Sequence, residues 1–168
     1  MPKCELTPAR WEEVDAVMEI LHNGRAFQRA QGFVQWDDSH PARGAVEDDI
    51  RGGNGYAVRV EGELAGYLCL SFDGDPAYPA IEGAWRYEGC YAVIHRMALG
   101  ENHRGKGLTG AVFRLAGELA RNRGVEILRI DTHADNLRMR HVLEKNGFSR
   151  CGTVVQNGGL RLAFDKKV

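Results

Sequence analysis

The sequence has few cysteines, no excess of charge and no long apolar run, and each shortage excludes a class of protein. The 168 residues include four cysteines, which are far apart and form no Cys-x-x-Cys pair. Neither a disulfide framework nor a zinc site is indicated by such spacing. Lysine and arginine (22) nearly balance aspartate and glutamate (23), which argues against nucleic-acid binding through bulk charge. We therefore expect no metal site and no nucleic-acid partner.

Membrane segments are also missing from the sequence. No apolar stretch approaches the roughly 18 residues that suggest a spanning helix, and the first residues lack the apolar core of a secretory signal. We expect a cytoplasmic protein that does not associate with membranes. Since no linker, repeat or low-complexity segment interrupts the chain, residues 1–168 are expected to form one domain with its own core.

Hydrophobic periodicity predicts a chain of alternating helices and strands. Thr7 and Pro8 resemble the start of a helix that ends at Gly24, followed by a short helix over residues 25–30 and a loop over residues 32–41. The remaining elements are helical residues near 47–50, strands over residues 56–60, 64–72, 91–99 and 127–131, helices over 108–123 and 135–146, and a hairpin over 154–164. This order predicts a mixed sheet in an α/β or α+β domain.

Residues 93–110 give the strongest functional signal. An apolar, strand-like run leads into Arg104-Gly105-Lys106-Gly107, and this loop opens onto a helical pattern. Glycines let backbone N–H groups approach a ligand closely. A helix N-terminus adds free N–H donors and the positive end of a dipole. With two cations in the same loop, the stretch predicts a pyrophosphate site.

Two cofactor classes fit such a site. Gly105, Gly107 and Gly110 match the G-x-G-x-x-G pattern of nicotinamide dinucleotide sites, and Asp131 ends the next strand as a ribose-binding acid would. Against this class, residues 100–104 separate the strand from the first glycine, and only 37 residues follow Asp131. The other class is coenzyme A, whose pantetheine arm can pair with a strand as a peptide does.

The same loop resembles the R/Q-x-x-G-x-G/A signature of the GNAT superfamily of N-acetyltransferases, with Asn102 where Arg or Gln is usual. Residues 131–136 with Met139 and residues 143–148 resemble the second motif of the family, which is a strand end, an Asn-led helix and a terminal Gly-Phe. Residues 92–99 resemble the strand that holds pantetheine. In all, the resemblance is to small bacterial members whose substrate is undefined.

This resemblance covers roughly residues 56–165. It implies a GNAT-type fold, in which a mixed, mostly antiparallel sheet is flanked by helices on both faces. It also implies an enzyme that transfers acetyl from acetyl-CoA, its cosubstrate, to the amine of a small molecule or peptide by direct attack. A homodimer is expected at the level of the family. The implied cofactor-binding residues are Met97, Ala98, Leu99, Asn102, His103, Arg104, Gly105, Lys106, Gly107, Leu108, Thr109, Asn136, Met139 and Lys145.

Two histidines are candidates for the base that removes a proton from the acceptor ammonium. His95, with an ordinary pKa of about 6.5, lies two residues before Met97 and is expected to share its strand face. A core histidine that is paired with a backbone carbonyl explains it equally well. His133, at a strand end, is the second candidate, and it is equally typical of a loop before a helix.

The acid that protonates the leaving thiolate has no candidate in the sequence. Family members often use a tyrosine on the last helix, and the motif places Leu143 at that position. Three functions therefore stay open: the acetyltransferase, an NAD-type oxidoreductase, and a non-catalytic module that binds acyl-CoA.

Overall fold

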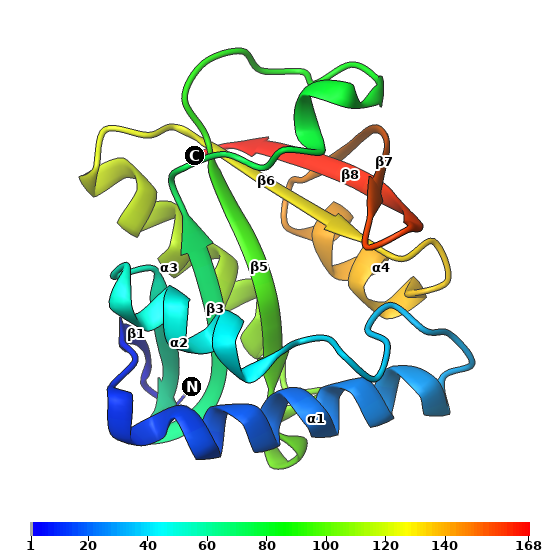
Figure 1. The fold of residues 1–168 in the computed structure, drawn as a ribbon. Helices are drawn as coiled ribbons and strands as arrows, with labels where there is room; N and C mark the ends of the chain where they lie inside the picture. Colours follow the sequence, from blue (N-terminus) through cyan, green and yellow to red (C-terminus); the bar gives the residue numbers. More distant parts are fainter. Residues whose placement is uncertain (1) are drawn as a thin grey trace.

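An eight-stranded sheet forms the centre of the structure, a computed structural model that describes residues 2–168 (Figure 1). The strand order is β1-β2-β3-β5-β6-β8-β7-β4. Along the chain the elements are β1 (Cys4–Pro8), a 3₁₀ turn η1 (Trp11–Glu13), α1 (Val14–Ala30), α2 (Arg43–Arg51), β2 (Gly55–Val60), β3 (Glu63–Ser71), η2 (Tyr78–Ala80), β4 (Glu82–Gly83), β5 (Ala92–Leu99), η3 (Glu101–His103), α3 (Leu108–Asn122), β6 (Ile127–Thr132), α4 (Leu137–Lys145), β7 (Ser149–Gln156) and β8 (Gly159–Lys167). None of the helices within residues 2–168 is both long and apolar enough to span a bilayer.

Helices cover both faces of the sheet. On one face, Val112 and Phe113 of α3 and Leu143 of α4 are buried against the central strands. On the other face, Leu21 of α1 and Val46 of α2 belong to a second buried cluster. All strand pairs described are antiparallel except β5–β6. The predicted fold class, a mixed and mostly antiparallel sheet with helices on both faces, is confirmed.

The parallel pair β5–β6 is short. Ala92 pairs with Leu128 and Val93 pairs with Arg129, and the two strands then diverge towards their carboxyl ends (Figure 1). Beyond Val93, the edge of β5 that faces β6 has no strand partner among the described residues. Its N–H and C=O groups are therefore available to an extended ligand.

Two expectations for the N-terminal region are wrong. Residues Cys4–Pro8 form an edge strand that pairs with β2, where Pro8 is tolerated because an edge position can do without a ladder N–H. Helix α1 starts only at Val14 and continues through Gly24 to Ala30. A Cβ at Gly24 would lie 3.2 Å from the Ala98 Cβ, so this glycine permits close packing of α1 on β5 and does not end the helix.

The end of α4 is confirmed as a Schellman motif. The Phe148 N–H donates to the Leu143 carbonyl at 3.0 Å and the Gly147 N–H donates to the Glu144 carbonyl at 3.1 Å, which is the paired pattern of that cap. The cap directs Phe148 into the core, where its ring centroid lies 5.1 Å from that of Phe113. Helix α4 is thereby fixed beside α3, and their N-terminal ends border the same cavity.

Candidate functional site

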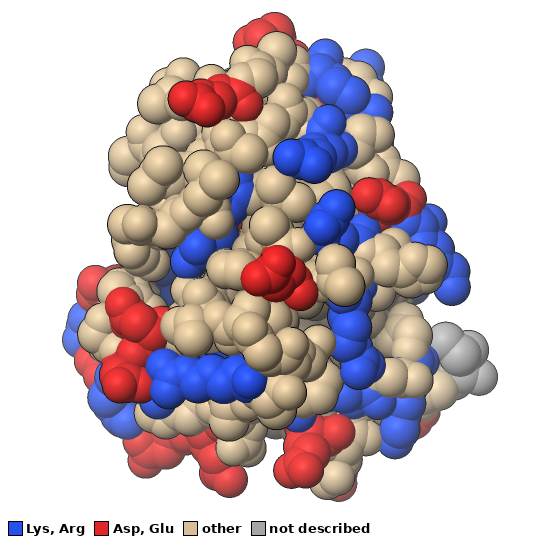
Figure 2. Space-filling model, turned by 90° about the vertical axis from the view of Figure 1, so that its right-hand side faces the viewer, with Lys and Arg blue, Asp and Glu red and all other residues tan. Residues whose placement is uncertain are grey.

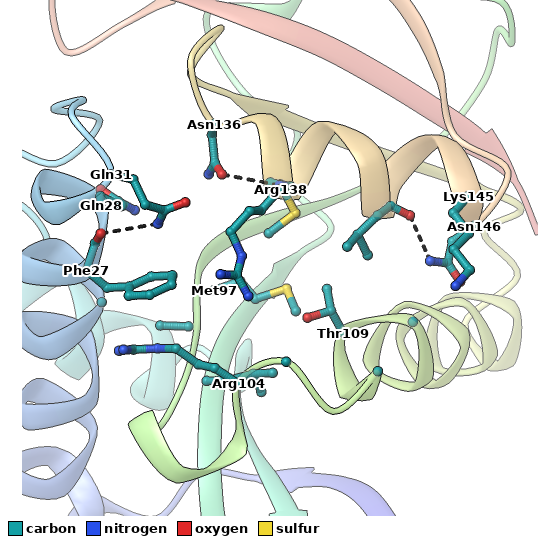
Figure 3. A pocket seen from close by; sticks show the side chains of 18 of the residues that line it. Phe27, Gln28, Gln31, Met97, Arg104, Thr109, Asn136, Arg138, Lys145 and Asn146 are labelled. Atoms are coloured by element: carbon teal, nitrogen blue, oxygen red, sulfur yellow. Dashed lines mark hydrogen bonds between the residues drawn. The ribbon is translucent and has the colours of Figure 1, made fainter.

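Two adjoining cavities lie where β5 and β6 diverge. The smaller, of about 310 Å³, is surrounded by α1, β5, the start of α3 and α4 (Figure 3). The larger, of about 610 Å³, extends between β5 and β6 towards β3 and the loop after it. Five residues line both cavities: Gln28, Trp36, Met97, Asn136 and Met139. A ligand in one cavity can therefore meet a ligand in the other near Met97.

The glycine loop borders the smaller cavity. Gly105 and Gly107 have φ angles of +71° and +74°, a region that glycine adopts without strain. Gly107 is also the N-cap of α3, and no side chain caps this helix. The first N–H groups of α3 therefore lack a side-chain acceptor at the wall of the cavity, an arrangement that suits an anion.

Two arginines stand over one aromatic ring in the smaller cavity. The guanidinium carbon of Arg104 lies 4.3 Å from the Phe27 ring centroid and that of Arg138 lies 5.2 Å from it, and Figure 3 shows both side chains reaching into the cavity. The Arg104 Nη2 atom is buried without a hydrogen-bond partner among the described residues. Burial, helped by the charge of Arg138 and opposed by Glu101, lowers the pKa of Arg104. An anionic ligand would relieve both the missing bond and the repulsion between the two cations.

The third glycine of the G-x-G-x-x-G pattern serves packing. A Cβ at Gly110 would lie 2.9 Å from the Asn146 Oδ1, so this glycine lets α3 approach the end of α4. Asn146 is held there by its own Nδ2, which donates to the Val142 carbonyl at 2.7 Å. The match to a dinucleotide fingerprint therefore combines two loop glycines with one helix-packing glycine.

A bulge in β5 shapes the wall between the cavities. Ala98 pairs with Tyr67 and His95 pairs with Cys69, so the two residues between them oppose only one residue of β3. Arg96 has a φ of +49° at this point. Because of the extra residue, Met97 packs with the cluster of α3 while Ala98 packs with that of α1. The expectation that His95 shares the strand face of Met97 is therefore wrong, although both residues line the larger cavity.

The bulge is fixed by a buried ion pair. Arg96 donates to Asp49 through Nε at 2.8 Å and Nη2 at 2.6 Å. The Tyr67 hydroxyl donates to the same carboxylate at 2.8 Å, and burial together with Asp49 raises the pKa of Tyr67. This network connects α2 to β5, and it pairs the charge of Asp49 with that of Arg96 inside the protein.

His95 lies beside another carboxylate of the larger cavity, since its Nε2 is 3.6 Å from Asp75 Oδ2. Burial, followed by the charge of Arg96, lowers the pKa of His95, against the opposing charges of Asp75 and Asp49. Asp131, at the end of β6, has a pKa raised to about 6, mainly by burial. At neutral pH the histidine is therefore uncharged and able to accept a proton.

The structure brings most of the predicted cofactor residues together. Ten line the smaller cavity, namely Met97, Ala98, Leu99, Arg104, Gly105, Gly107, Thr109, Asn136, Met139 and Lys145. Four do not: Asn102 and His103 lie in the turn η3, Lys106 is exposed and Leu108 is buried in the core.

The two candidate bases lie in different places. His95 lines the larger cavity, whereas His133 lines neither cavity and stacks on Phe33 with ring centroids 5.2 Å apart. The His133 Nδ1 accepts the Asp135 N–H at 3.0 Å. Of the two candidates, only His95 lines either of these cavities.

Several lining residues are not predicted by the sequence patterns. They are Phe27, Gln28 and Arg138 of the smaller cavity, and Asp75 and Gln156 of the larger one. Arg138 had a local signal, since it lies two residues after Asn136, the N-cap of α4. The others come from segments far apart in the chain, so only the fold identifies them.

Comparisons with known proteins point to one family. Residues 21–148 match the acetyltransferase (GNAT) family. A GNAT-family acetyltransferase from Streptococcus agalactiae superposes with a TM-score of 0.88 at 31% identity, covering 98% of this chain and 95% of that one. The acetyltransferase AAC(6')-Ib, solved with ribostamycin and coenzyme A, superposes with a TM-score of 0.72 at 22% identity, covering 98% and 93%, a likeness of fold.

A curated relative is the streptothricin acetyltransferase of Streptomyces lavendulae. It is 28% identical over 109 residues, which cover 65% of this chain and 51% of that protein. The chain therefore spans about half the length of this relative.

Proposed function

This chain belongs to the acetyltransferase (GNAT) family, and we propose that it transfers the acetyl group of acetyl-CoA to an amine by direct attack. The observation that carries the proposal is the smaller cavity, where the buried, unpartnered Nη2 of Arg104 lies with the uncapped N-terminus of α3. Both features suit the phosphates of coenzyme A. The larger cavity beside it has the size of a small-molecule site, so a small-molecule amine is the acceptor that we favour.

The residues of the smaller cavity fit coenzyme A along its length. Arg104, Arg138 and the first N–H groups of α3 would hold the pyrophosphate, and Lys145 extends the basic lining. Figure 2, which views the molecule from the side of α4, shows lysine and arginine side chains spread over this face together with several acidic ones. The pantetheine arm would pair with the free edge of β5, which leads to Met97 and the junction of the cavities.

The chemistry at the junction needs a base and a hydrogen-bond donor. Acetyl-CoA supplies the activated acetyl group when it is bound. His95 would take a proton from the acceptor ammonium, because burial keeps the imidazole neutral near pH 7. Backbone N–H groups near Met97 to Leu99, on the free edge of β5, would donate to the thioester oxygen as it gains charge.

The structure bears differently on the two alternative functions, the NAD-type oxidoreductase and the non-catalytic acyl-CoA module. A dinucleotide fold needs two parallel βαβ halves, whereas the sheet formed by residues 2–168 has a single, short parallel pair. A non-catalytic acyl-CoA module is favoured by one observation, the leucine at position 143, which is buried in the core and offers no proton.

Calorimetric titration with acetyl-CoA, coenzyme A and NADH tests the cofactor class, and release of free thiol with a panel of amines tests the transfer. We expect acetyl-CoA binding and amine-dependent thiol release. Binding of NADH without binding of coenzyme A would overturn the proposal. Acetyl-CoA binding with no thiol release for any amine would favour the non-catalytic module. A cytoplasmic location and a homodimer stay predictions.

A further inference from the structure

The larger cavity contains a pair of carboxylates that the proposed acetyl transfer does not use. Asp75 and Asp131 both line it, and Asp75 has a relative exposure of only 8%. The Gln156 Nε2 donates to Asp75 Oδ2 at 2.8 Å and to Asp131 Oδ2 at 3.4 Å. The Tyr78 hydroxyl donates to Asp131 Oδ2 at 2.8 Å. Gln156 thus bridges the two carboxylates, and Tyr78 is a second neutral donor to Asp131.

The two arginines that line the same cavity, Arg96 and Arg161, bind other partners. Arg96 forms its two-pronged ion pair with Asp49. Arg161 donates to the backbone carbonyl groups of Gln35 at 2.7 Å and Leu160 at 3.2 Å. It contributes a charge at longer range to Asp131 but makes no salt bridge with it within the described residues. Buried carboxylates are usually paired with a cation, and here that cation is absent from residues 2–168.

The histidine beside the pair does not supply the charge either. His95 Nε2 lies 3.6 Å from Asp75 Oδ2, but burial lowers the pKa of this imidazole, so it is neutral near pH 7. The pKa of Asp131 is raised to about 6, mainly by burial and also by the charge of Asp75. The other ionisable groups that face the pair are Tyr78, Tyr91, Asp73 and Arg161.

An independent observation at the junction points to a ligand with N–H donors. The Gln28 Oε1 atom is buried without a hydrogen-bond partner in the described structure, and Gln28 lines both cavities. Leaving a buried acceptor unsatisfied costs about 1–3 kcal/mol. An amine that enters the junction from the larger cavity would satisfy this oxygen.

We propose that the larger cavity selects acceptors with at least two amino groups, holding one as an ammonium between Asp75 and Asp131 while the other reacts beside His95 and Gln28. The inference rests on the proposed function, since it assigns the acceptor of the same reaction. The division of roles follows from charge. Two carboxylates keep an ammonium protonated and therefore unreactive, whereas a neutral imidazole accepts the proton that a nucleophilic amine must lose.

The test compares α,ω-diaminoalkanes of increasing chain length with 1-aminoalkanes of the same lengths as acceptors. With acetyl-CoA, kcat/KM for the best diamine is expected to exceed that for its monoamine by about tenfold or more, the scale of one charge-assisted hydrogen bond. Asp131→Asn keeps an acceptor oxygen for Tyr78 but removes the charge, so the ratio of the two kcat/KM values should fall towards one. Asp135→Asn, an exposed carboxylate outside both cavities, should keep the ratio of the wild type.

A binding arm separates this inference from the proposed function. Calorimetry with the diamine alone, without acetyl-CoA, should show binding that releases protons near pH 6, because a bound cation lowers the pKa of Asp131. Asp131→Asn protein should lose this binding while its melting temperature at pH 8 does not fall. If acetyl-CoA does not bind, the proposed function fails, and the diamine titration still reports on the carboxylate pair.

Two results would overturn the inference. One is an equal kcat/KM for monoamines and diamines in the wild-type protein together with no diamine binding. The other is an Asp131→Asn protein that keeps its preference for diamines but loses the acidic limb of the pH–rate profile, since Asp131 would then be the proton acceptor of the reaction.

Discussion

Replacement of His95 by glutamine tests the proposed chemistry most directly. Glutamine has a similar reach and can still hydrogen-bond near Asp75, but it cannot accept a proton. The His95 side chain is about one-fifth exposed (22%), and its contact with Asp75 at 3.6 Å is longer than a hydrogen bond. We therefore expect little change in packing.

The expected loss of turnover follows from the role of the base. Removal of a positioned proton acceptor lowers the rate by about 10²-fold, which corresponds to about 2.7 kcal/mol of transition-state stabilisation. Because burial lowers the pKa of His95, the rising limb of kcat/KM in the wild-type protein should lie below the ordinary histidine value. That limb should disappear in the variant, while the Kd of acetyl-CoA stays the same because its proposed site is in the smaller cavity.

Stability provides the second readout. A histidine whose pKa is lowered in the folded state favours folding above its unfolded pKa, and this contribution is lost as the pH falls through its folded pKa. His95→Gln protein should therefore resist acidification somewhat better than the wild type. The matched variant His133→Gln, which lies outside both cavities, should keep the acidic limb. A His95→Gln protein with a lowered melting temperature and an unchanged acidic limb would refute the catalytic role.

Three further results are expected. Gly107→Val should abolish acetyl-CoA binding in calorimetry, because φ is +74° and a side chain would be added at the wall of the smaller cavity. Gly32→Val, with φ of +91° and equally open surroundings away from the cavities, should suffer similar strain and still bind. Arg104→Met should raise the acetyl-CoA Kd about tenfold or more by removing a charge-assisted bond, with a melting temperature close to the wild-type value. Arg96→Met should leave Asp49 buried without its cation and cost about 3–5 kcal/mol of unfolding free energy, measured by urea titration.

The geometry of the glycine loop could be predicted because its parts are contiguous. The strand, the two positive-φ glycines and the start of α3 follow one another within residues 93–110, so local sequence determines their geometry. The larger cavity has no such signal. Asp75, His95, Asp131 and Gln156 belong to four separate segments, and only the pairing of β3, β5, β6, β8 and β7 brings them together.

Local periodicity failed where tertiary packing takes precedence over it. Gly24 has the composition of a helix stop, yet α1 continues because the missing Cβ is needed for contact with Ala98. The alternation of β5 fails at Arg96, because the ion pair with Asp49 holds a bulge that adds one residue to the strand. Neither the contact of Gly24 with Ala98 nor that of Arg96 with Asp49 can be predicted from neighbouring residues in the sequence.

The position of the family tyrosine connects these observations to the fate of the protons. Leu143 is fully buried in the core with Phe113 and Phe148, and its neighbour Val142 lines the smaller cavity, so neither of these two side chains can act as the acid. On the proposed path, the acceptor ammonium gives one proton to His95 and the amide nitrogen gives a second to solvent after attack. The protonated His95 can then return its proton to the coenzyme A thiolate. We therefore expect His95→Gln to slow both thiolate protonation and amine activation, and an acceptor amine of low pKa, already neutral at pH 7, to recover only part of the lost rate.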